Sequence, residues 1–530
     1  MHVVLRTAEL RDLIFYFVFE TALDEKEKAS AAALARTCRD FMEPALRVLW
    51  ATHWSFDAFV QLLPEDKITR AVMGAKLIGI LTTDDLARVR YYGAFVREFI
   101  LNYHDAGLSP HNLTQIMIAL DGHALFPNLR SFGYCHRGVG YKDYFAPCLP
   151  ALISRTVTEV YFDLNRPFPD ENLALEMSIL FSLKTKNKVS TLHLDVVENV
   201  PSNYAELLEG WTSLRHLRLY LCCSRVAPAL VAVSALQGLR TLTLDANSEV
   251  ALECPPMGPA NDSLQQLVIR KHLDDDFAAD VIAILHPKAL TSLHVDAKLA
   301  PEAIRLLAVR MSTCCAPHML KYIILGNRDN PPKEGDRVVL QDILPLLSFT
   351  GLVSVSIHVF DIRFDDADIT RLAAAWPRLR TLSLCGASKM TPACTLASLL
   401  SLARGCPDLE ELSLALDATE PPSDATNTPQ PADQPHAPAR GRPPYRLRKL
   451  DVMRSPICSE PEHVASFLTR YFPFLRPLGV KAGLDEEKDE ESVPWGEYQR
   501  QVRWRMVRRL MPTFLEARKT GIYGIGVDRG

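Results

Sequence analysis

The sequence predicts an α/β solenoid, in which short repeats stack so that their strands form a parallel sheet and their helices lie outside it. Two observations predict this fold. The pattern apolar-x-x-apolar-x-apolar recurs in one register from Val189 to Leu447, and between Val189 and Leu409 its copies start 25 to 32 residues apart. The chain is also 530 residues long, beyond the roughly 250–300 residues at which a single compact core stops growing.

The strands are expected at the repeated pattern itself. Its fourth and sixth positions are apolar and alternate with polar positions, which is typical of a short strand with one buried face. Strong copies begin at Val189, Leu214, Leu239, Leu264, Leu290, Leu320, Leu352, Leu379, Leu409 and Leu447, and weaker copies begin at Val96, Leu129, Val157 and Leu475.

Helices are expected between the copies of the pattern. Residues 274–285, 365–376 and 395–406 have helical character, and each stretch comes just before a predicted strand. Asp275, Asp366 and Thr395 can cap the first turns of these helices with their side-chain oxygens. Alternating strands and helices at this short period predict that only stacking of repeats makes a core.

The repeats resemble the leucine-rich repeat family. The resemblance implies a horseshoe-shaped solenoid with its parallel sheet on the concave face. The family motif continues to Asn or Cys three residues after the last strand leucine, and Asn247 and Cys222 occupy that place. Ala387, Asp417 and Lys298 stand there in other copies, so the repeats are degenerate. An irregular α/β protein with chance copies of the pattern is the alternative.

The N-terminal region is expected to be helical. Residues 1–62 form one predicted domain and residues 63–95 a helical linker or cap before the solenoid. The stretch 9–23 is apolar nearly all round, so it should be buried or docked against another protein. An acidic loop is expected at 24–30, and the following helix should break or kink at Pro44.

This helical segment resembles the F-box, in the variant common among fungal F-box/leucine-rich-repeat proteins. The resemblance implies docking to a Skp-family adaptor and, through it, to a cullin ubiquitin ligase. The family usually has Leu-Pro where this chain has Arg6 and Thr7, and a simple helical cap on the solenoid is the alternative. The residues that match, and that the resemblance implies contact the adaptor, are Leu5, Glu9, Leu10, Leu13, Ile14, Phe15, Leu34, Cys38, Phe41, Pro44, Leu46 and Trp50.

A target protein is expected on the concave face, where solvent-facing strand positions of successive repeats lie side by side. Several repeats have Asp directly after the last buried strand residue, so this face should be acidic and suit a basic segment of a target. The alternative is that Asp merely ends each strand. The candidate target-binding residues are Tyr161, Asp163, His193, Asp195, Arg218, Asp245, His294 and Asp296.

The solenoid is expected to span residues 96–480, with a disordered insertion at 421–444. That insertion is rich in Pro, Ala, Thr and Asp and has almost no large apolar residue. Residues 481–530 are expected to be an acidic linker followed by a helix and tail. A capping helix that pairs with the acidic run is favoured over a membrane or nucleic-acid role. Its apolar face is expected to contain Trp495, Val502, Met506 and Leu510.

Composition argues against several classes of protein. The formal net charge of -4 gives no electrostatic reason to bind nucleic acid or an anionic membrane. The N-terminal apolar run 13–19 is much shorter than the roughly 20 residues of a membrane span, and no cleavage site follows it, so we expect no signal peptide. Twelve cysteines without a CxxC pair favour a reducing compartment, the cytoplasm or nucleus.

The sequence contains no phosphate-binding loop, nucleophile elbow or zinc motif. We therefore expect no catalytic residues, no cofactor and no metal, and hence no enzyme. The favoured function is that of a substrate receptor in a Skp-cullin-F-box type ubiquitin ligase, with an unknown protein as its target. The alternative is an interaction scaffold of the same fold without a ligase contact.

Overall fold

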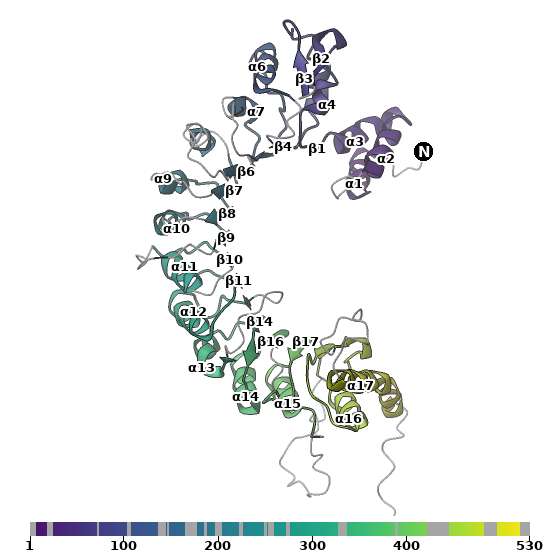
Figure 1. Ribbon diagram of the computed structural model, residues 1–530, viewed down its shortest axis with the longest axis vertical. Coiled ribbons are helices and arrows are strands. Elements are labelled where there is room, and N and C mark those ends of the chain that lie inside the picture. Colours follow the sequence, from purple (N-terminus) through teal and green to yellow (C-terminus); the bar gives the residue numbers. More distant parts are fainter. Residues whose placement is uncertain are drawn as a thin grey trace, which may run out of the picture. The chain divides into compact units, whose positions relative to one another are not determined.

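The computed structural model describes residues 7–18, 25–71, 74–102, 108–135, 145, 148–164, 178–184, 188–196, 204–221, 226–247, 252, 259–271, 276–326, 337–386, 391–420, 445–481 and 495–519. The chain divides into two compact units, Met1–Asp245 and Ala246–Gly530. Figure 1 labels the elements of both units.

The first unit begins with a small helical bundle. In it, α3 (Arg39–Leu49) packs against both α1 (Ala8–Val18) and α2 (Glu25–Ala35). The expected loop at 24–30 is wrong from residue 25 onward, because Glu, Lys and Ala are good helix formers and start α2 there.

Of the expected break or kink at Pro44, the break is wrong, since α3 continues through this proline. The chain instead leaves the helical conformation before Cys38, whose backbone is extended with φ -157°. Pro44 removes only its own backbone donor, and its ring is buried in the bundle. Burial of the ring offsets part of the cost of the lost hydrogen bond.

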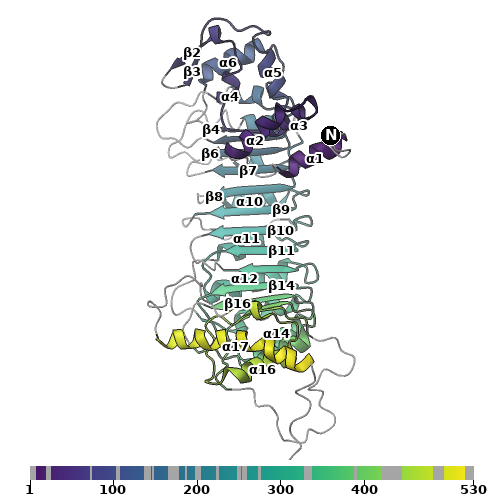
Figure 2. The same ribbon diagram turned by 90° about the vertical axis from the view of Figure 1, so that its right-hand side faces the viewer.

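A parallel sheet follows, with its strands in chain order. The order is β1 (Thr52–His53), β4 (Glu98–Asn102), β5 (Ser131–Cys135), β6 (Glu159–Leu164), β7 (Thr191–Val196), β8 (His216–Leu221) and β9 (Thr241–Ala246). Figure 2 shows β4, β6, β7, β8 and β9 of this sheet lying side by side. Because β1 pairs with β4, the sheet begins at Thr52 and not at residue 96 as expected.

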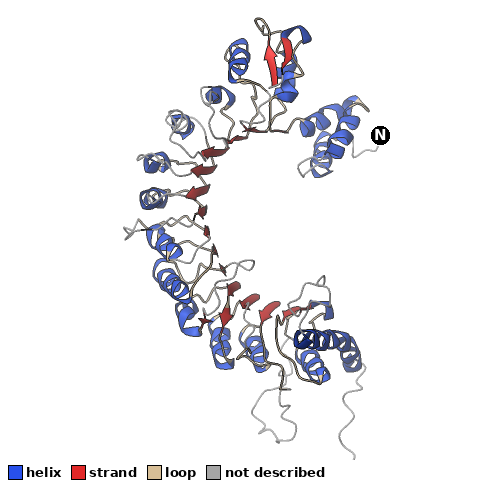
Figure 3. Ribbon diagram, viewed as in Figure 1, coloured by secondary structure: helices blue, strands red, loops and turns tan. Residues whose placement is uncertain are grey.

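The helices of the first unit that lie between these strands cover one side of the sheet (Figure 3). They are α4 (Asp57–Val60), α5 (Ala87–Gly93), α6 (Pro110–Ala119), α7 (Leu149–Leu152), α9 (Tyr204–Leu208) and α10 (Val226–Ser234). The expected helical linker or cap over 63–95 is wrong in part. It contains an antiparallel pair, β2 (Ile68–Ala71) and β3 (Gly74–Leu77), between a 3₁₀ turn at Glu65–Lys67 and α5. β-branched Ile68 and Thr69 favour a strand there.

The second unit repeats the same arrangement. Its parallel strands, again in chain order, are β10 (Gln266–Lys271), β11 (Ser292–Asp296), β12 (Tyr322–Leu325), β14 (Ser354–Val359), β16 (Thr381–Gly386), β17 (Glu411–Leu414), β18 (Lys449–Asp451) and β19 (Val480–Lys481). A separate pair joins β13 (Arg337–Val338) to β15 (Asp361–Ile362).

The helices of the second unit are α11 (Phe277–Leu285), α12 (Pro301–Cys314), α13 (Leu340–Ile343), α14 (Asp366–Ala375), α15 (Ala397–Gly405), α16 (Pro461–Tyr471) and α17 (Trp495–Lys519), with 3₁₀ turns at Leu344–Ser348 and Pro477–Gly479. Neighbouring helices pack on one another, as α11 does on α12 and α14 on α15. Stacked helices on one side of a parallel sheet make each unit an α/β solenoid-like fold.

The repeated pattern maps onto the strands in both units. Each strand from β4 to β18 of the long sheet starts two residues after the first apolar position of its copy, as β9 does after Leu239. Leu239, Leu242 and Leu244 are all fully buried, and so are the matching leucines of other copies, such as Leu382 in β16. Burying each such side chain contributes roughly 1.5–3 kcal/mol, so the pattern supplies the core of every repeat.

Capping differs from expectation in the second unit. The N-cap of α14 is Asp365, which accepts a hydrogen bond from the backbone N–H of Asp368 at 2.8 Å. Asp366, the expected cap, instead accepts from the backbone N–H of Thr395 at 2.8 Å and from its hydroxyl at 2.7 Å. It thereby connects two successive repeats. Asp275 lies outside the described residues.

The C-terminal helix α17 packs against α16, as expected of a capping helix. The predicted face is wrong, however. Trp504, Val507 and Met511 are buried, whereas Met506 is exposed. The indole Nε1 of Trp504 donates to the backbone oxygen of Ser455 at 3.0 Å, which fixes this face toward the solenoid. The acidic run before α17 and the insertion at 421–444 lie outside the described residues.

Among the described helices, none combines the length and the apolar composition needed to cross a membrane.

Candidate functional site

One face of α1 is apolar and exposed. Leu10, Leu13, Ile14, Phe17 and Val18 recur at the three- and four-residue spacing of a helix face. Leu13 is 48% exposed and Phe17 63% exposed, and the other three are also exposed. Large apolar side chains gathered on one exposed helix face are typical of a surface that binds another protein. We call these five residues the apolar face of α1.

The opposite side of α1 holds it on the bundle. The ring of Phe15 is buried and meets Phe41 of α3 edge to face, with ring centroids 5.7 Å apart. Arg47 of α3 pairs with Asp12 at 2.9 Å and with Glu43 at 2.7 Å. These exposed ion pairs contribute little, so the aromatic contact is the main anchor of α1.

The predicted adaptor-binding residues therefore fall into two groups. Leu10, Leu13 and Ile14 are exposed on the apolar face of α1, and Glu9 is exposed beside them. Phe17 and Val18 belong to the same face but were missed, although their helical spacing in the sequence would have found them. The predicted residues that are partly or fully covered within the first unit are Phe15, Leu34, Cys38, Phe41, Pro44, Leu46 and Trp50, and Leu5 lies outside the described residues.

Trp50 illustrates the covered group. Its ring stacks on Tyr92 of α5 with centroids 4.5 Å apart, and it also meets Phe59 of α4 at 5.3 Å. This aromatic cluster joins the helical bundle to the first strands of the sheet. The indole is therefore occupied by the chain's own fold, and Trp50 is a structural residue of the first unit.

A second candidate surface lies on the sheet of the first unit. The strand register sets Tyr161 beside His193, and His193 beside Arg218. Two residues further along the same strands, Asp163 lies beside Asp195. Side chains at equivalent positions of neighbouring strands thus form a row across the sheet, as the repeat pattern predicts. We call Tyr161, Asp163, His193, Asp195, Arg218 and Asp245 the sheet cluster.

The members of the sheet cluster bind one another. The Tyr161 hydroxyl donates a hydrogen bond to Asp195 Oδ2 at 3.1 Å. Arg218 Nε donates to Asp245 Oδ2 at 2.7 Å, and the two form an ion pair. The rings of Tyr161 and His193 meet edge to face with centroids 6.2 Å apart. The cluster is therefore a polar network and not a row of free carboxylates.

Burial corrects the expected acidic character of this surface. Asp163 is 1% exposed and Asp245 is 8% exposed, so neither faces solvent as expected. The side chain of Asp245 is held inward by Arg218. Asp195, Tyr161 and His193 are half-buried, and Arg218 is exposed. The groups that a partner can reach on the sheet cluster are thus one carboxylate, one phenol, one imidazole and one guanidinium.

Burial also changes the ionisation of these groups. It raises the pKa of Asp195, although the hydrogen bond from Tyr161 opposes the change. It raises the pKa of the Tyr161 phenol as well, with the charge of Asp195 adding to the effect. Burial and then the charge of Arg218 lower the pKa of His193. The imidazole is therefore neutral at pH 7, and Arg218 is the positive group of this surface.

The remaining predicted target-binding residues belong to the second unit. His294 and Asp296 lie on β11, and Asp296 is paired in register with Arg270 of β10. Burial lowers the pKa of His294, while Asp296 opposes this and Arg270 adds to it. An acidic residue with a neighbouring arginine thus recurs here, as it does at Arg218 and Asp245.

Metal ligands do not gather within the part of the chain that the structure describes, where no group of three or more His, Cys, Asp or Glu could hold an ion.

Comparisons with known proteins add little. No family model and no curated protein matches the chain. Among solved structures it is similar to a chain in the structure of the Toll–Spatzle complex, a molecular hub in Drosophila development and innate immunity. That similarity has 11% sequence identity and a TM-score of 0.28, and covers 75% of this chain and 64% of that chain. The chain thus spans less than two thirds of that protein, and a TM-score this low carries no argument.

The class of protein follows from the order of the strands and the placement of the helices. Parallel strands in chain order, with helices stacked on one side, define an α/β solenoid-like protein in each unit. The first unit adds a helical bundle with an exposed apolar helix at its start.

Proposed function

We propose that this chain is the target-binding subunit of a Skp-cullin-F-box type ubiquitin ligase. In this proposal α1, α2 and α3 form an F-box-like domain that binds a Skp-family adaptor, and the solenoid is a leucine-rich-repeat array that binds the target protein. The observation that supports the adaptor contact is the apolar face of α1, which is exposed although Phe15 on the same helix is buried against Phe41 of α3.

The form of this face suits a helix-in-groove contact. Side chains at positions i, i+3, i+4, i+7 and i+8 place five large apolar groups on one stripe of α1. Central apolar residues of such interfaces cost roughly 2–4 kcal/mol of binding when truncated. Asp12, which lies outside this stripe, pairs with Arg47 of α3.

The leucine-rich-repeat assignment is supported by the match between pattern and strand. Each copy supplies one parallel strand whose apolar residues are buried, and Asn247 and Cys222 stand where the family motif has its Asn or Cys. The sheet cluster is the proposed target surface of the first unit. Because Arg218 neutralises Asp245, it suits a target segment with mixed polar groups better than a purely basic one.

No covalent chemistry is required of this chain. A receptor that holds a target near a charged conjugating enzyme raises the effective concentration of the target lysines. The adaptor contact and the target contact must then be made by different surfaces. The apolar face of α1 and the sheet cluster meet this condition because they share no residue.

The adaptor contact is tested by a double variant, Leu13→Ala with Ile14→Ala. Both side chains are exposed, so the variant should keep the stability of the bundle while losing apolar contact area. We expect the affinity for a recombinant Skp-family adaptor to fall by at least about thirtyfold, the equivalent of about 2 kcal/mol, so that the adaptor no longer co-purifies. Binding is measured by pull-down and by titration with the full chain.

Ile118→Ala provides the matched control. Ile118 is an apolar residue of the same unit that is even more exposed, at 74%, but it lies on α6. It should leave adaptor binding unchanged. If the wild-type chain does not bind the adaptor at micromolar concentration, the ligase proposal is wrong. The chain would then be an interaction scaffold of the same fold.

A further inference from the structure

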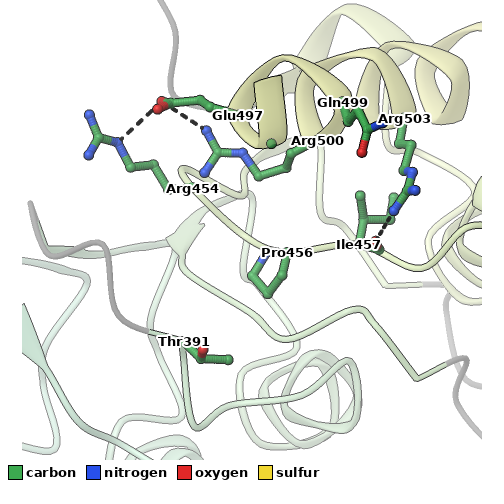
Figure 4. Close-up of a pocket in the computed structure, with 9 residues that line it drawn as sticks. Thr391, Arg454, Pro456, Ile457, Glu497, Gln499, Arg500 and Arg503 are labelled. Atoms are coloured by element: carbon green, nitrogen blue, oxygen red, sulfur yellow. Dashed lines mark hydrogen bonds and ion pairs between the residues drawn. The ribbon is translucent and has the colours of Figure 1, made fainter. Parts of the chain in front are cut away.

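A cavity of about 350 Å³ lies in the second unit where α17 begins. Figure 4 shows Arg500 and Arg503 entering it from the first turns of α17 and Arg454 from the segment after β18. The other residues that line it are Thr391, Pro456, Ile457, Gly496, Glu497 and Gln499. The cavity is thus built by three segments of the second unit, at Thr391, at 454–457 and at the start of α17.

The cavity has an excess of positive charge. Among the described residues that line it are three arginines and one glutamate, so two positive charges remain after Glu497 is counted. Glu497 Oε1 is shared, since Arg500 approaches it at 3.2 Å and Arg454 at 3.8 Å. Arg503 donates instead to the backbone oxygen of Ile457 at 3.0 Å. A single carboxylate therefore balances only part of this cluster.

One buried donor in the cavity wall has no acceptor among the described residues. The Nε of Arg500 is buried and has no hydrogen-bond partner among the described residues, and a buried guanidinium N–H without an acceptor is costly. Gly496 also lines the cavity in the first turn of α17, where helix N–H groups have no intrahelical acceptor. A Cβ built on Gly496 would meet no described atom within 4 Å.

We propose that this cavity binds a phosphate monoester group. A dianion matches the excess of two positive charges, whereas a carboxylate would leave one charge unbalanced. Planar guanidinium groups donate paired hydrogen bonds to phosphate oxygens, and the positive end of the 25-residue helix α17 adds to the attraction. The proposal does not depend on the adaptor contact, because it uses other residues in the other unit.

The cavity favours a ligand that is already charged at neutral pH. Burial lowers the pKa of Arg500, and the nearby charge of Arg454 adds to this effect while Glu497 opposes it. An anion between the two arginines would therefore relieve both the desolvation and the repulsion. A surface arginine, by contrast, gains little free energy from an added anion, because water already screens its charge.

The experiment titrates the full chain in buffer free of phosphate and sulfate, at constant ionic strength. The probes are O-phosphoserine, a capped tripeptide with phosphoserine at its centre, the same tripeptide without phosphate, and acetate. Binding is measured by calorimetry at probe concentrations up to roughly 10 mM, the affinity range of a few charge-assisted hydrogen bonds. We expect both phosphorylated probes to bind at least about tenfold more tightly than acetate or the unphosphorylated peptide.

Two variants locate the site. Arg454→Gln and Arg500→Gln each remove one charge from the cavity, and each should weaken phosphoserine binding about tenfold. Arg509→Gln is the matched control, because Arg509 is an exposed arginine of the same helix away from the cavity. Melting temperatures are recorded for all variants. Arg454 is the decisive position, since its side chain is 40% exposed and its replacement should not unfold α17.

The outcomes separate clearly. Tighter binding of the phosphorylated tripeptide than of O-phosphoserine identifies a phosphorylated protein as the source of the group. Equal or tighter binding of O-phosphoserine identifies a small phosphate monoester. The proposal is overturned if neither phosphorylated probe binds, if acetate binds as tightly, or if Arg509→Gln weakens binding as much as Arg454→Gln.

Discussion

At the scale of single residues, His53 couples the stability of the first unit to pH. It lies on β1, where its ring contacts Trp50 and Phe59 with centroids 5.1 and 4.9 Å away. Its Nε2 is buried and has no hydrogen-bond partner within the described ranges. Burial, with a smaller contribution from the charge of Lys28, lowers its pKa to about 4. The folded protein therefore keeps this imidazole neutral under conditions in which the unfolded chain protonates it.

Acid should consequently destabilise the first unit. Because the folded pKa lies below the unfolded value of about 6.5, only the unfolded chain binds the proton between these values, and stability falls as pH decreases through this window. At pH 5 the loss from this group is on the order of 2 kcal/mol. His53→Phe should remove that part of the pH dependence, as measured by urea unfolding at pH 7 and pH 5. The exposed His216→Gln is the control, and an unchanged pH dependence in His53→Phe would show that other groups cause it.

The sheet cluster shows what sequence can predict about a single residue. The repeat pattern places Tyr161 beside His193 and Asp163 beside Asp195, and the strand register has these neighbours. It does not predict that Asp163 and Asp245 are buried, because alternation assigns a face to a side chain and not its depth. It also gives no sign of the Arg218–Asp245 pair, which depends on side-chain conformation across two strands.

At the scale of elements, α17 stabilises the end of the second unit through Trp504. The indole is 1% exposed, and its Nε1 donates to the backbone oxygen of Ser455. Trp504→Ala should lower the free energy of unfolding of this unit by roughly 3–5 kcal/mol, because it removes a large buried ring and leaves a backbone acceptor unpaired. Thermal unfolding of the full chain measures the effect as an earlier transition.

Met506→Ala is the comparison for this prediction. Met506 lies two residues away on the same helix and is 40% exposed, so its truncation should cost less than about 1 kcal/mol. Equal losses in the two variants would mean that α17 does not bury the face that contains Trp504. Arg503 and Arg518 also donate to backbone oxygens of the solenoid, at Ile457 and Ser466, and should keep α17 in place in Met506→Ala.

The choice of face on α17 could not be read from its sequence. Two sets of apolar residues have the spacing of a helix face. One set is Val502, Met506 and Leu510, and the other is Trp504, Val507 and Met511. Contact with α16 and the acceptor at Ser455 decide between the two sets, and both are tertiary features. The existence of the helix was predictable because it depends on local propensity over its 25 residues.

At the scale of the whole molecule, the insertion at 421–444 should be dispensable for stability. Its sequence has almost no large apolar residue, and loop length alone costs only about 0.6 kcal/mol per doubling. Replacing these residues with a short Gly-Ser linker between Glu420 and Tyr445 should leave the melting temperature nearly unchanged. The insertion lies between β17 and β18 in the chain. A decrease of many degrees in the melting temperature would show that the insertion packs on the solenoid.

The order of the strands was largely predictable at this scale, and the beginning of the sheet was not. Each copy of the pattern specifies one strand, and stacking of consecutive copies gives the chain order found in both units. β1 contains only Thr52 and His53 and has no copy of the pattern. Its place beside β4 comes from the aromatic cluster of Trp50, Phe59 and Tyr92, which no periodicity in the sequence announces.

The exposed stripe on α1 has a consequence for how long the protein persists in a cell. A chain that displays Leu13, Ile14 and Phe17 to water presents the kind of surface that quality-control chaperones and proteases bind. A partner that covers this stripe adds stabilisation by mass action, which grows with the partner's free concentration. The steady-state abundance of the protein would then follow the supply of its partner, so that copies made in excess are the first to be degraded.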